Sequence, residues 1–390
     1  MSRRARERAR AAVIVLDACG IGALPDAAEY GDDGAATLQH LADAVRGLDL
    51  PVLGRLGLGS IAAIAGVRPA DAPVLHGRLH PLGPGKDSAT GHWELMGAVT
   101  PAPLPTYPDG FPPDVVAMLE RATGQRFCCN RPYNGIEALD DYGAHHLATG
   151  ELILYTSVDS VLQVAAHVDV LPAAALHDTC RRIRAQMTGE HAVGRVIARP
   201  FAGEPGAFAR TDGRKDLAVA PPGPTYLEAL AAAGVPVHGV GKVDDLFAGR
   251  GIAEAHRGAT NAEALDATYD LLRALDRGFI FTNLVETDQV YGHRKDVDGF
   301  HQALRRIDAA VGGWLELLGP DDLLVLTADH GVDPAMAHTD HTREHVPLLA
   351  VFAGHGGRRH DGPLADVGAS VHRWLTGTDA PELPGHPFVD

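Results

Sequence analysis

Short apolar runs that end in polar or acidic residues recur along the chain. The first is AAVIVLD at 11–17, and runs of the same form follow at 235–243, 278–288 and 322–331. Another apolar run lies at 345–354. Runs of this length, rich in β-branched residues and bounded by turn-forming residues, predict buried β-strands.

Segments with helical periodicity lie between these strands, including 225–234 and 261–278. Strands that alternate with helices predict an α/β fold with a mostly parallel sheet. Ligands of such sheets bind beyond the carboxyl ends of the strands. Polar residues follow those ends here, so we expect the active site at that edge of the sheet.

The middle of the chain interrupts this alternation. Proline-rich stretches lie at 100–113 and 217–225, and 390 residues exceed the usual size of one domain. We therefore interpret residues 105–218 as a smaller domain inserted into a discontinuous core, which comprises residues 1–104 and 219–390.

Charge and composition narrow the class of protein. A formal net charge of −16 argues against a general nucleic-acid or anionic-membrane binder. The four cysteines show no CxxC pairing, which suits a reducing cytoplasm. No apolar run approaches the roughly 20 residues of a membrane span, and the basic start at 2–10, interrupted by Glu7, reads as a solvated tail. Because the chain is acidic, binding of an anionic substrate would require positively charged side chains gathered at the binding site.

Metal-type ligands follow three of the predicted strands: Asp17, Asp288, His293, Asp329, His330 and His341. Taken singly, each has a structural explanation, and 21 histidines make chance clusters easier. The pattern favours metal binding, because DHG follows one strand, DxxxxH a second and Asp a third. Mixed carboxylate and imidazole ligands suit Mn²⁺ or Zn²⁺. Two such ions can clamp a phosphoryl group and activate a nucleophile.

The loop GKDSATGHWE at 85–94 holds two hydroxyls, Ser88 and Thr90, before an expected helix. A helix N-terminus favours phosphate, and a hydroxyl there could attack phosphorus. The alternative is that Ser88 or Thr90 only caps the helix. The loop alone leaves both interpretations open.

Seven segments in order, spanning residues 13–348, resemble the phosphopentomutases of the alkaline phosphatase superfamily. They are VLDACGIGALPDA, GKDSATGHWELMG, YTSVDSVLQVAAH, GRVIARPFAGEPGAFART, GKVDDLFAGRGI, NLVETDQVYGHRKD and TADHGVDPAMAHTDHTREHVPLL. The resemblance implies an alkaline-phosphatase-like core with an inserted α/β cap domain. It also implies an isomerase that uses Mn²⁺ to interconvert (deoxy)ribose 1- and 5-phosphates.

The resemblance also implies roles for individual residues. Asp17, Asp329, His330 and the oxygen of Ser88 would hold one metal, and Asp288, His293 and His341 the other. The family's nucleophile directly follows the aspartate of the KD pair, which selects Ser88 over Thr90. The implied cycle runs through a phosphorylated enzyme and a bisphosphorylated sugar, with glucose 1,6-bisphosphate as the priming donor.

Substrate binding in the family falls to an aspartate, two cap arginines and a core lysine. These correspond to Asp159, Arg195, Arg210 and Lys242, with Arg199 and Arg214 as register alternatives. Such residues would supply the local cations that the acidic chain requires, because arginine pairs bidentately with phosphate. The alternative for any single arginine is a solvated surface charge.

The chain departs from the family in three places. Ser88 stands where threonine is usual, Ala18 and Cys19 replace a serine and an aromatic residue, and 128–143 lacks an expected hydroxyl-rich run. These departures leave a metal-dependent sugar-phosphate phosphatase, or a phosphomutase for a different sugar, as alternatives. A metal-stabilised binding protein without activity is a further one. The expected partner is a small sugar phosphate, and the oligomeric state stays open.

Overall fold

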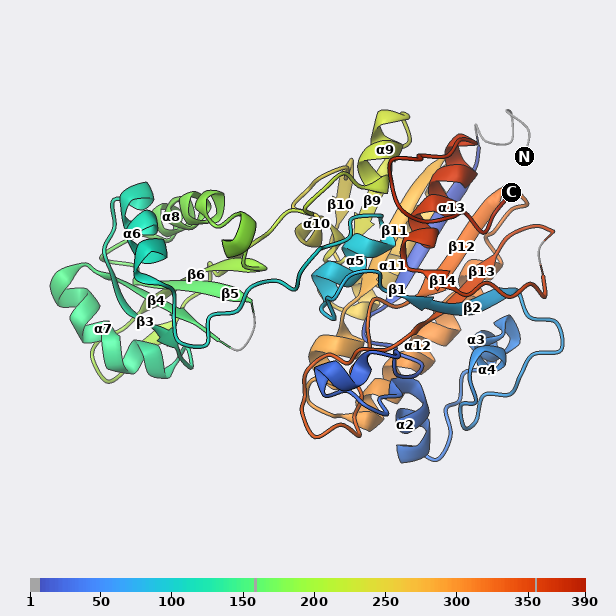
Figure 1. Cartoon of the computed structure of the whole chain (residues 1–390), viewed down its shortest axis with the longest axis horizontal. Coiled ribbons are helices and arrows are strands. Elements are labelled where there is room, and N and C mark those ends of the chain that lie inside the picture. Colours follow the sequence, from blue (N-terminus) through green and yellow to red (C-terminus); the bar gives the residue numbers. More distant parts are fainter. Residues whose placement is uncertain (1–7, 158–159, 355) are drawn as a thin grey trace. The chain divides into compact units, whose positions relative to one another are not determined.

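The computed structural model describes residues 8–157, 160–354 and 356–390. The chain divides into two compact units (Figure 1). The core unit comprises Met1–Ala102 and Pro221–Asp390, and the inserted unit comprises Pro103–Ala220. Both units combine helices with a sheet, so the α/β class predicted from the sequence is confirmed.

The sheet of the core unit has eight strands in the described part of the chain. Their order is β10 (Glu254–His256), β9 (Val237–Val240), β11 (Gly278–Leu284), β1 (Arg10–Leu16), β12 (Asp322–Thr327), β13 (Val346–Val351), β2 (Leu75–His80) and β14 (Gly362–Pro363). Neighbouring strands from β10 to β12 are parallel, and β13 is antiparallel to both β12 and β2. The predicted mostly parallel sheet is therefore confirmed.

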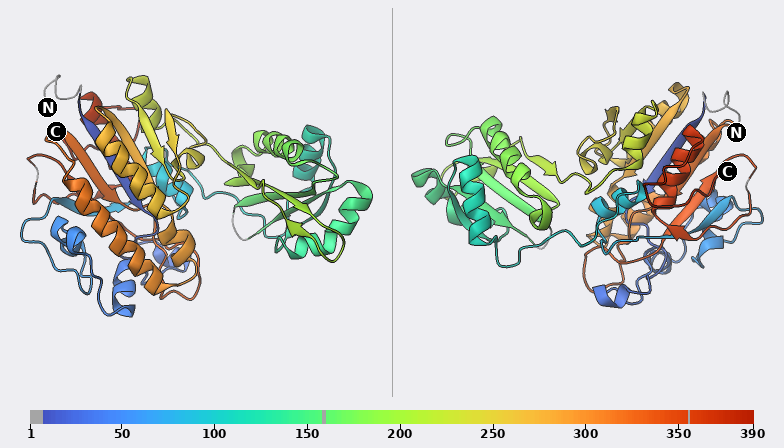
Figure 2. Two further views of the ribbon diagram at one scale, coloured as in Figure 1. Left: turned by 180° about the vertical axis from the view of Figure 1, so that it is seen from behind. Right: turned by 45° about the horizontal axis from the view of Figure 1, so that its top comes forward.

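Helices cover both faces of this sheet. The helical elements of the core unit are η1 (Ala27–Tyr30), α2 (Thr37–Ala44), α3 (Pro51–Leu56), α4 (Leu58–Ile61), α5 (Ser88–Leu95), α9 (Tyr226–Ala232), α10 (Val243–Leu246), α11 (Asn261–Ala274), η3 (Thr287–Gly292), α12 (Val297–Leu315) and α13 (Ala365–Thr376). Helix α13 lies on one face, and α11 and α12 lie side by side on the other (Figures 1 and 2). Helices α9 and α11 both begin at capping boxes, formed by Thr225 with Glu228 and by Thr260 with Glu263.

The inserted unit is a second, smaller α/β layer structure. It contains α6 (Pro113–Thr123), β3 (Phe127–Pro132), α7 (Glu137–Thr149), β4 (Leu152–Thr156), β5 (Val161–His167), α8 (Ala173–Gln186), η2 (Gly189–His191), β6 (Arg195–Ala202), β7 (Ala209–Arg210) and β8 (Lys215–Ala218). Alternate residues of β4 point to opposite faces. Leu152 packs with residues of α6 and α8, and Ile153 packs with residues of α7. The sheet therefore has an apolar core on each face.

No helix in the described part of the chain combines the length and apolar character that crossing a membrane requires.

Candidate active site

The first group of ligands lies where two neighbouring strands end. β1 and β12 are parallel partners with Val15 opposite Thr327, so Asp17 and Asp329 leave the sheet at the same edge. The imidazole of His330 lies between them. Its Nε2 is 3.4 Å from Asp17 Oδ1 and 3.3 Å from Asp329 Oδ2. All three side chains are buried, and one donor atom from each lies within 4.8 Å of the others.

The second group gathers around Asp288, which lies in the π-helical turn η3 after β11. Asp288 Oδ1 is 3.3 Å from His293 Nε2 and 3.5 Å from His341 Nε2. The ring centroids of His330 and His341 are 4.0 Å apart, so the two groups adjoin. The structure thus brings the six residues predicted as metal ligands together in two adjacent groups of three.

Hydrogen bonds from the protein orient the ligands. Nδ1 of His293 lies 2.7 Å from the carbonyl oxygen of Thr339, and Nδ1 of His330 lies 3.1 Å from the carbonyl oxygen of Gly331. An imidazole that donates Nδ1–H to a carbonyl keeps the lone pair on Nε2, which is the nitrogen that faces the aspartates. The hydrogen bonds of His293 and His330 therefore orient each ring in the way that is usual for histidines that bind a metal through Nε2.

Several ligand atoms are buried and have no hydrogen-bond partner among the described residues: Asp17 Oδ1, Asp288 Oδ1, Asp329 Oδ2 and His341 Nε2. A buried carboxylate oxygen without a partner is costly. The four atoms belong to the two groups and would be satisfied together by cations between them. The donor set of oxygen and imidazole nitrogen fits divalent ions of the Mn²⁺ and Zn²⁺ type.

Proton affinities in the site are strongly perturbed. Burial, with the charges of Asp329 and Asp288, raises the pKa of Asp17 well above its ordinary value. Burial alone would raise the pKa of Asp288, but His293 and His341 beside it lower it. Asp288 in turn raises the pKa of His293 to about 9. The metal-free site therefore holds protons that a bound cation would displace.

The two hydroxyls of the 85–94 loop occupy different environments. Ser88 is the first residue of α5, and its Oγ lies 3.0 Å from His330 Nε2. Thr90 is buried, and its Oγ1 donates to Asp87 Oδ2 at 2.9 Å. The N-cap is Asp87, which accepts from the backbone N–H groups of Ala89 and Thr90 at 3.0 and 3.1 Å. The alternative in which Ser88 or Thr90 caps the helix is therefore wrong.

Three further residues contact the site; His92 and Asn283 were not singled out from the sequence, and Ala18 was noted only as a departure from the family. His92 is buried, and its Nδ1 lies 2.8 Å from the carbonyl oxygen of Ser88 and 3.1 Å from Asp329 Oδ2. Asn283 donates to Asp17 Oδ2 at 2.8 Å. Ala18 adopts a left-handed φ of 66°, and its N–H donates to Asp329 Oδ1 at 3.3 Å. Only His92 carried a usable signal, because it follows Ser88 by four residues and so shares its helix face.

The residues expected to bind substrate lie in both units. Lys242 follows β9 in the core unit, close enough to Asp17 for its charge to lower the pKa of that carboxyl. Arg195 and Arg210 lie in the inserted unit on β6 and β7. Arg195 Nη1 is 3.8 Å from Asp216 Oδ2. Asp159 lies outside the described residues.

The register alternatives Arg199 and Arg214 belong to the same group of positive charge. Half-buried Arg199 donates from Nε to Gln163 Oε1 at 2.7 Å, and burial together with Arg214 and Arg210 lowers its pKa. Arg214 makes a bidentate pair with Asp216, with both bonds at 2.7 Å. Arg214 is therefore already matched to a carboxylate, whereas Arg199 is held by a neutral amide.

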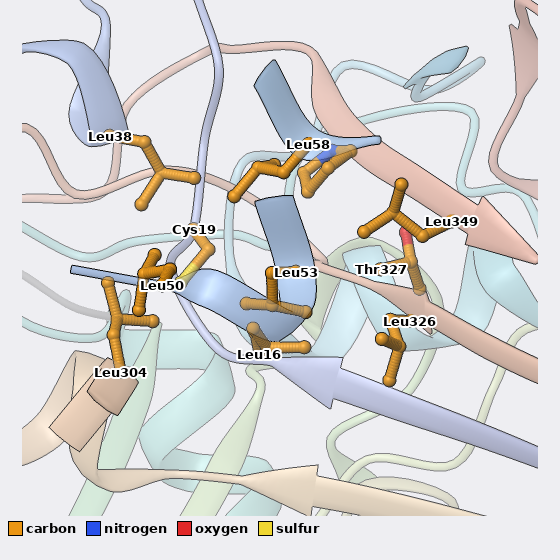
Figure 3. Close-up of a pocket in the computed structure, with 11 residues that line it drawn as sticks. Leu16, Cys19, Leu38, Leu50, Leu53, Leu58, Leu304, Leu326, Thr327 and Leu349 are labelled. Carbon is orange, nitrogen blue, oxygen red and sulfur yellow. The ribbon is translucent and has the colours of Figure 1, made fainter. Parts of the chain in front are cut away.

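Two further features lie outside the site. An apolar pocket in the core unit is lined mostly by leucines, and the sulfur of Cys19 points among them (Figure 3). Burial raises the pKa of Cys19 well above its ordinary value, so this thiol stays protonated. A leucine-lined pocket has no charged group with which to bind phosphate.

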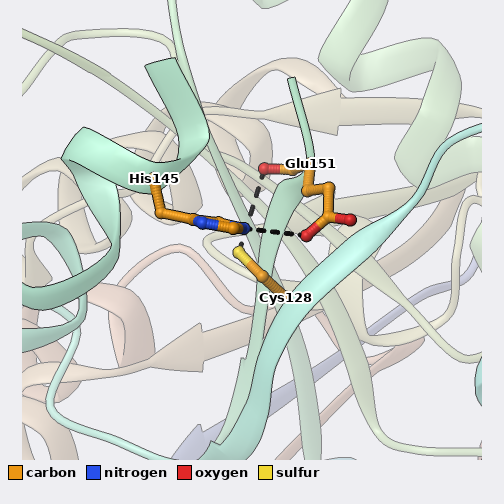
Figure 4. Close-up of side chains that lie close together, drawn as sticks. All are labelled: Cys128, His145 and Glu151. Carbon is orange, nitrogen blue, oxygen red and sulfur yellow. Dashed lines mark hydrogen bonds and ion pairs between the residues drawn. The ribbon is translucent and has the colours of Figure 1, made fainter. Parts of the chain in front are cut away.

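In the inserted unit, Cys128, His145 and Glu151 point toward one another (Figure 4). His145 Nε2 lies 2.9 Å from Glu151 Oε2, and Cys128 Sγ donates to the carbonyl oxygen of Glu151 at 3.9 Å. Burial raises the pKa of Cys128 to about 12. These contacts are those of a protonated thiol beside an imidazole–carboxylate pair.

Comparison with known proteins gives a family match over nearly the whole chain. The model of the Metalloenzyme superfamily matches residues 9–376. The phosphopentomutase of Anaeromyxobacter dehalogenans (strain 2CP-C) is 49% identical over 372 residues, covering 94% of this chain and 95% of that protein. The phosphopentomutase of Acetivibrio thermocellus is 45% identical over 370 residues, covering 94% and 95%.

Solved structures with a similar course of the chain are more distant in sequence. The PH0037 protein from Pyrococcus horikoshii has a TM-score of 0.48 at 15% identity, covering 95% of this chain and 97% of that one. Leishmania mexicana phosphoglycerate mutase has a TM-score of 0.47 at 14% identity, covering 97% and 98%. With TM-scores below 0.5, neither likeness carries an argument.

Proposed function

Because the chain belongs to the phosphopentomutase family and is thus an isomerase of the intramolecular phosphotransferase class, we propose that it interconverts (deoxy)ribose 1-phosphate and (deoxy)ribose 5-phosphate through a phosphoserine at Ser88. The observation that carries the mechanism is the place of Ser88. Its hydroxyl lies 3.0 Å from His330 Nε2, beside two groups of buried metal-type ligands.

In this proposal two divalent ions, Mn²⁺ by preference, bind the two groups. Asp17, Asp329, His330 and Ser88 would hold one ion, and Asp288, His293 and His341 the other. The buried ligand atoms that lack hydrogen-bond partners support this division. When bound, the ions would favour ionisation of the Ser88 hydroxyl and neutralise charge on the phosphoryl group.

The chain's own residues would then carry the phosphoryl group through two transfers. In the first, an oxygen of the pentose monophosphate takes the phosphoryl group from phosphorylated Ser88, which gives a pentose bisphosphate and the free serine. In the second, the oxygen of Ser88 attacks the other phosphorus of that bisphosphate. The P–O bond to the sugar breaks, the sugar oxygen takes up a proton, and the isomerised monophosphate leaves.

A bisphosphate intermediate requires binding groups for two phosphates. Lys242, Arg195, Arg210 and Asp159 are the proposed substrate-binding residues. Supporting this role, Lys242 lies near Asp17, and several arginines of the inserted unit influence one another's proton affinity. Glucose 1,6-bisphosphate would serve as the primer that first phosphorylates Ser88. Four free cysteines support a reducing, cytoplasmic location as part of the same proposal.

The test is a product analysis with purified protein and Mn²⁺. Ribose 1-phosphate should become ribose 5-phosphate, with a lag that glucose 1,6-bisphosphate shortens. Free phosphate without isomerised product would instead make the protein a phosphatase, in keeping with a serine that lacks the methyl group of threonine. Turnover of a hexose phosphate but no pentose phosphate would contradict the proposed sugar and leave the mutase chemistry intact.

A further inference from the structure

Two adjacent strands at the edge of the core sheet bring together another group of side chains that could bind a metal ion. β10 is the edge strand and pairs in parallel with β9, with Glu254 opposite His238 and His256 opposite Val240. Side chains alternate between the two faces of a sheet, so Glu254 and His256, two residues apart, share a face. Directly paired residues also share a face, which adds His238.

One donor atom from each of these three side chains lies within 4.8 Å of the other two. His238 Nδ1 lies 3.0 Å from His256 Nε2 and 3.7 Å from Glu254 Oε2. His256 Nε2 lies 3.8 Å from Glu254 Oε1. With metal–ligand bonds of about 2.0–2.2 Å, two ligands of a tetrahedral zinc ion are separated by roughly 3.3–3.6 Å. The separations between the three side chains, 3.0, 3.7 and 3.8 Å, lie on either side of this range.

Hydrogen bonding accounts for only part of this arrangement. The two imidazoles are within hydrogen-bonding distance of each other, but the carboxylate lies beyond that distance from both of the ring nitrogens that face it. The burial of His238, together with the neighbouring His256, lowers its pKa. The ring of His238 is thus available in the neutral form that a metal ligand requires.

We propose that His238, Glu254 and His256 form a zinc site separate from the two-metal centre. Glu254 has 63% of its side chain exposed, His256 21% and His238 9%, so the ion can enter from solvent. Two imidazoles and one carboxylate fill three positions of a tetrahedron. Water would take the fourth position.

The position of the proposed zinc site in the chain indicates a structural role. His238 lies on β9, and Glu254 and His256 lie on β10, so the ion would join the two ends of the segment 239–253. That segment carries Lys242, the proposed phosphate-binding residue. A short edge strand such as β10, with only three residues, has few hydrogen bonds of its own. The zinc ion would fasten it to the sheet.

The test is metal stoichiometry in the full-length protein. Wild type and His256→Gln are incubated with excess Mn²⁺ and limiting to excess Zn²⁺, dialysed, and their metal content is measured by mass spectrometry. Wild type should retain one more equivalent of zinc than His256→Gln, and Glu254→Gln should lower the affinity of the same site. Circular dichroism of the variants checks that they are folded.

The control is the other mixed group of the chain, in the inserted unit. Cys128→Ala should keep the additional zinc, and Co²⁺ in the site should give tetrahedral absorption without a thiolate-to-cobalt band. Zinc should also raise the unfolding temperature of wild type more than that of His256→Gln. Equal zinc content in wild type and folded His256→Gln, or loss of the zinc in Cys128→Ala, would overturn the proposal.

Discussion

Replacing Asp17 by Asn should stabilise the metal-free protein and remove its response to one metal. In the metal-free site, the facing oxygens of Asp17 and Asp329 lie within 4.8 Å of each other. Two full charges at that distance repel by about 3.5 kcal/mol at an effective dielectric constant of about 20. Asn removes this repulsion, and its amide oxygen can still accept the hydrogen bond from Asn283.

The stability gained by Asp17→Asn should depend on pH, because in the metal-free wild type a proton bound to Asp17 relieves the same repulsion. Burial and nearby carboxylates raise the pKa of Asp17, so the metal-free native state binds a proton more tightly than the unfolded chain. That contribution to stability is present at low pH and is lost as pH rises toward the raised pKa. The advantage of Asp17→Asn should therefore grow as pH rises above about 4, the ordinary pKa of an aspartate, and the repulsion that it removes is about 3.5 kcal/mol at a separation of 4.8 Å.

The assay is urea unfolding followed by tryptophan fluorescence, with EDTA or with Mn²⁺. All three tryptophans, Trp93, Trp314 and Trp374, lie in the core unit, so the signal reports that unit alone. Mn²⁺ at 100 times its dissociation constant should stabilise wild type by about 2.7 kcal/mol per site, and Asp17→Asn should lose one such increment. A variant that is less stable than wild type in EDTA at pH 8, or equally stabilised by Mn²⁺, would refute this reasoning.

Three further predictions concern residues around the site and in the inserted unit. His92→Phe keeps an aromatic ring but removes the nitrogen beside Asp329, so the Mn²⁺ affinity measured by titration should fall about 10–100-fold. An unchanged affinity would contradict a positioning role for His92. Gly91→Ala would place a methyl group 2.5 Å from the carbonyl oxygen of Asp329, so turnover should fall on the order of 100-fold; near-normal turnover would contradict the observed packing. His146 is buried and accepts a hydrogen bond from the N–H of His167 at 2.9 Å, and burial lowers its pKa. The unfolded chain therefore binds the proton more tightly, and the stability of the inserted unit, followed by hydrogen exchange, should fall as pH drops below about 6.5. His146→Gln should show a weaker pH dependence, and an equally steep one would exclude His146 as the cause.

The sheet could be predicted because its signal is local in the sequence. The run at 11–17 has the composition of a buried strand, and it forms β1 with Asp17 just beyond its end. The pairing of metal-type residues followed from the rule that parallel strands end at one edge. The structure places Asp17 and Asp329 together for this reason.

Other features depend on tertiary contacts and could not be predicted. The left-handed backbone of Ala18 arises where its N–H turns toward Asp329, and nothing in an alanine signals that conformation. Asn283 contacts Asp17 because β11 and β1 are neighbours, a pairing that the sequence does not specify. The group of His238, Glu254 and His256 likewise depends on strand register.

The most direct test of the central claim is the location of the phosphate during turnover. The protein is incubated with Mn²⁺ and glucose 1,6-bisphosphate, and peptides are analysed by mass spectrometry for wild type, Ser88→Ala and Thr90→Ala. Wild type and Thr90→Ala should carry one phosphate on Ser88, and Ser88→Ala should carry none and lose several orders of magnitude in rate. Phosphate on Thr90, or undiminished isomerisation by Ser88→Ala, would contradict the account.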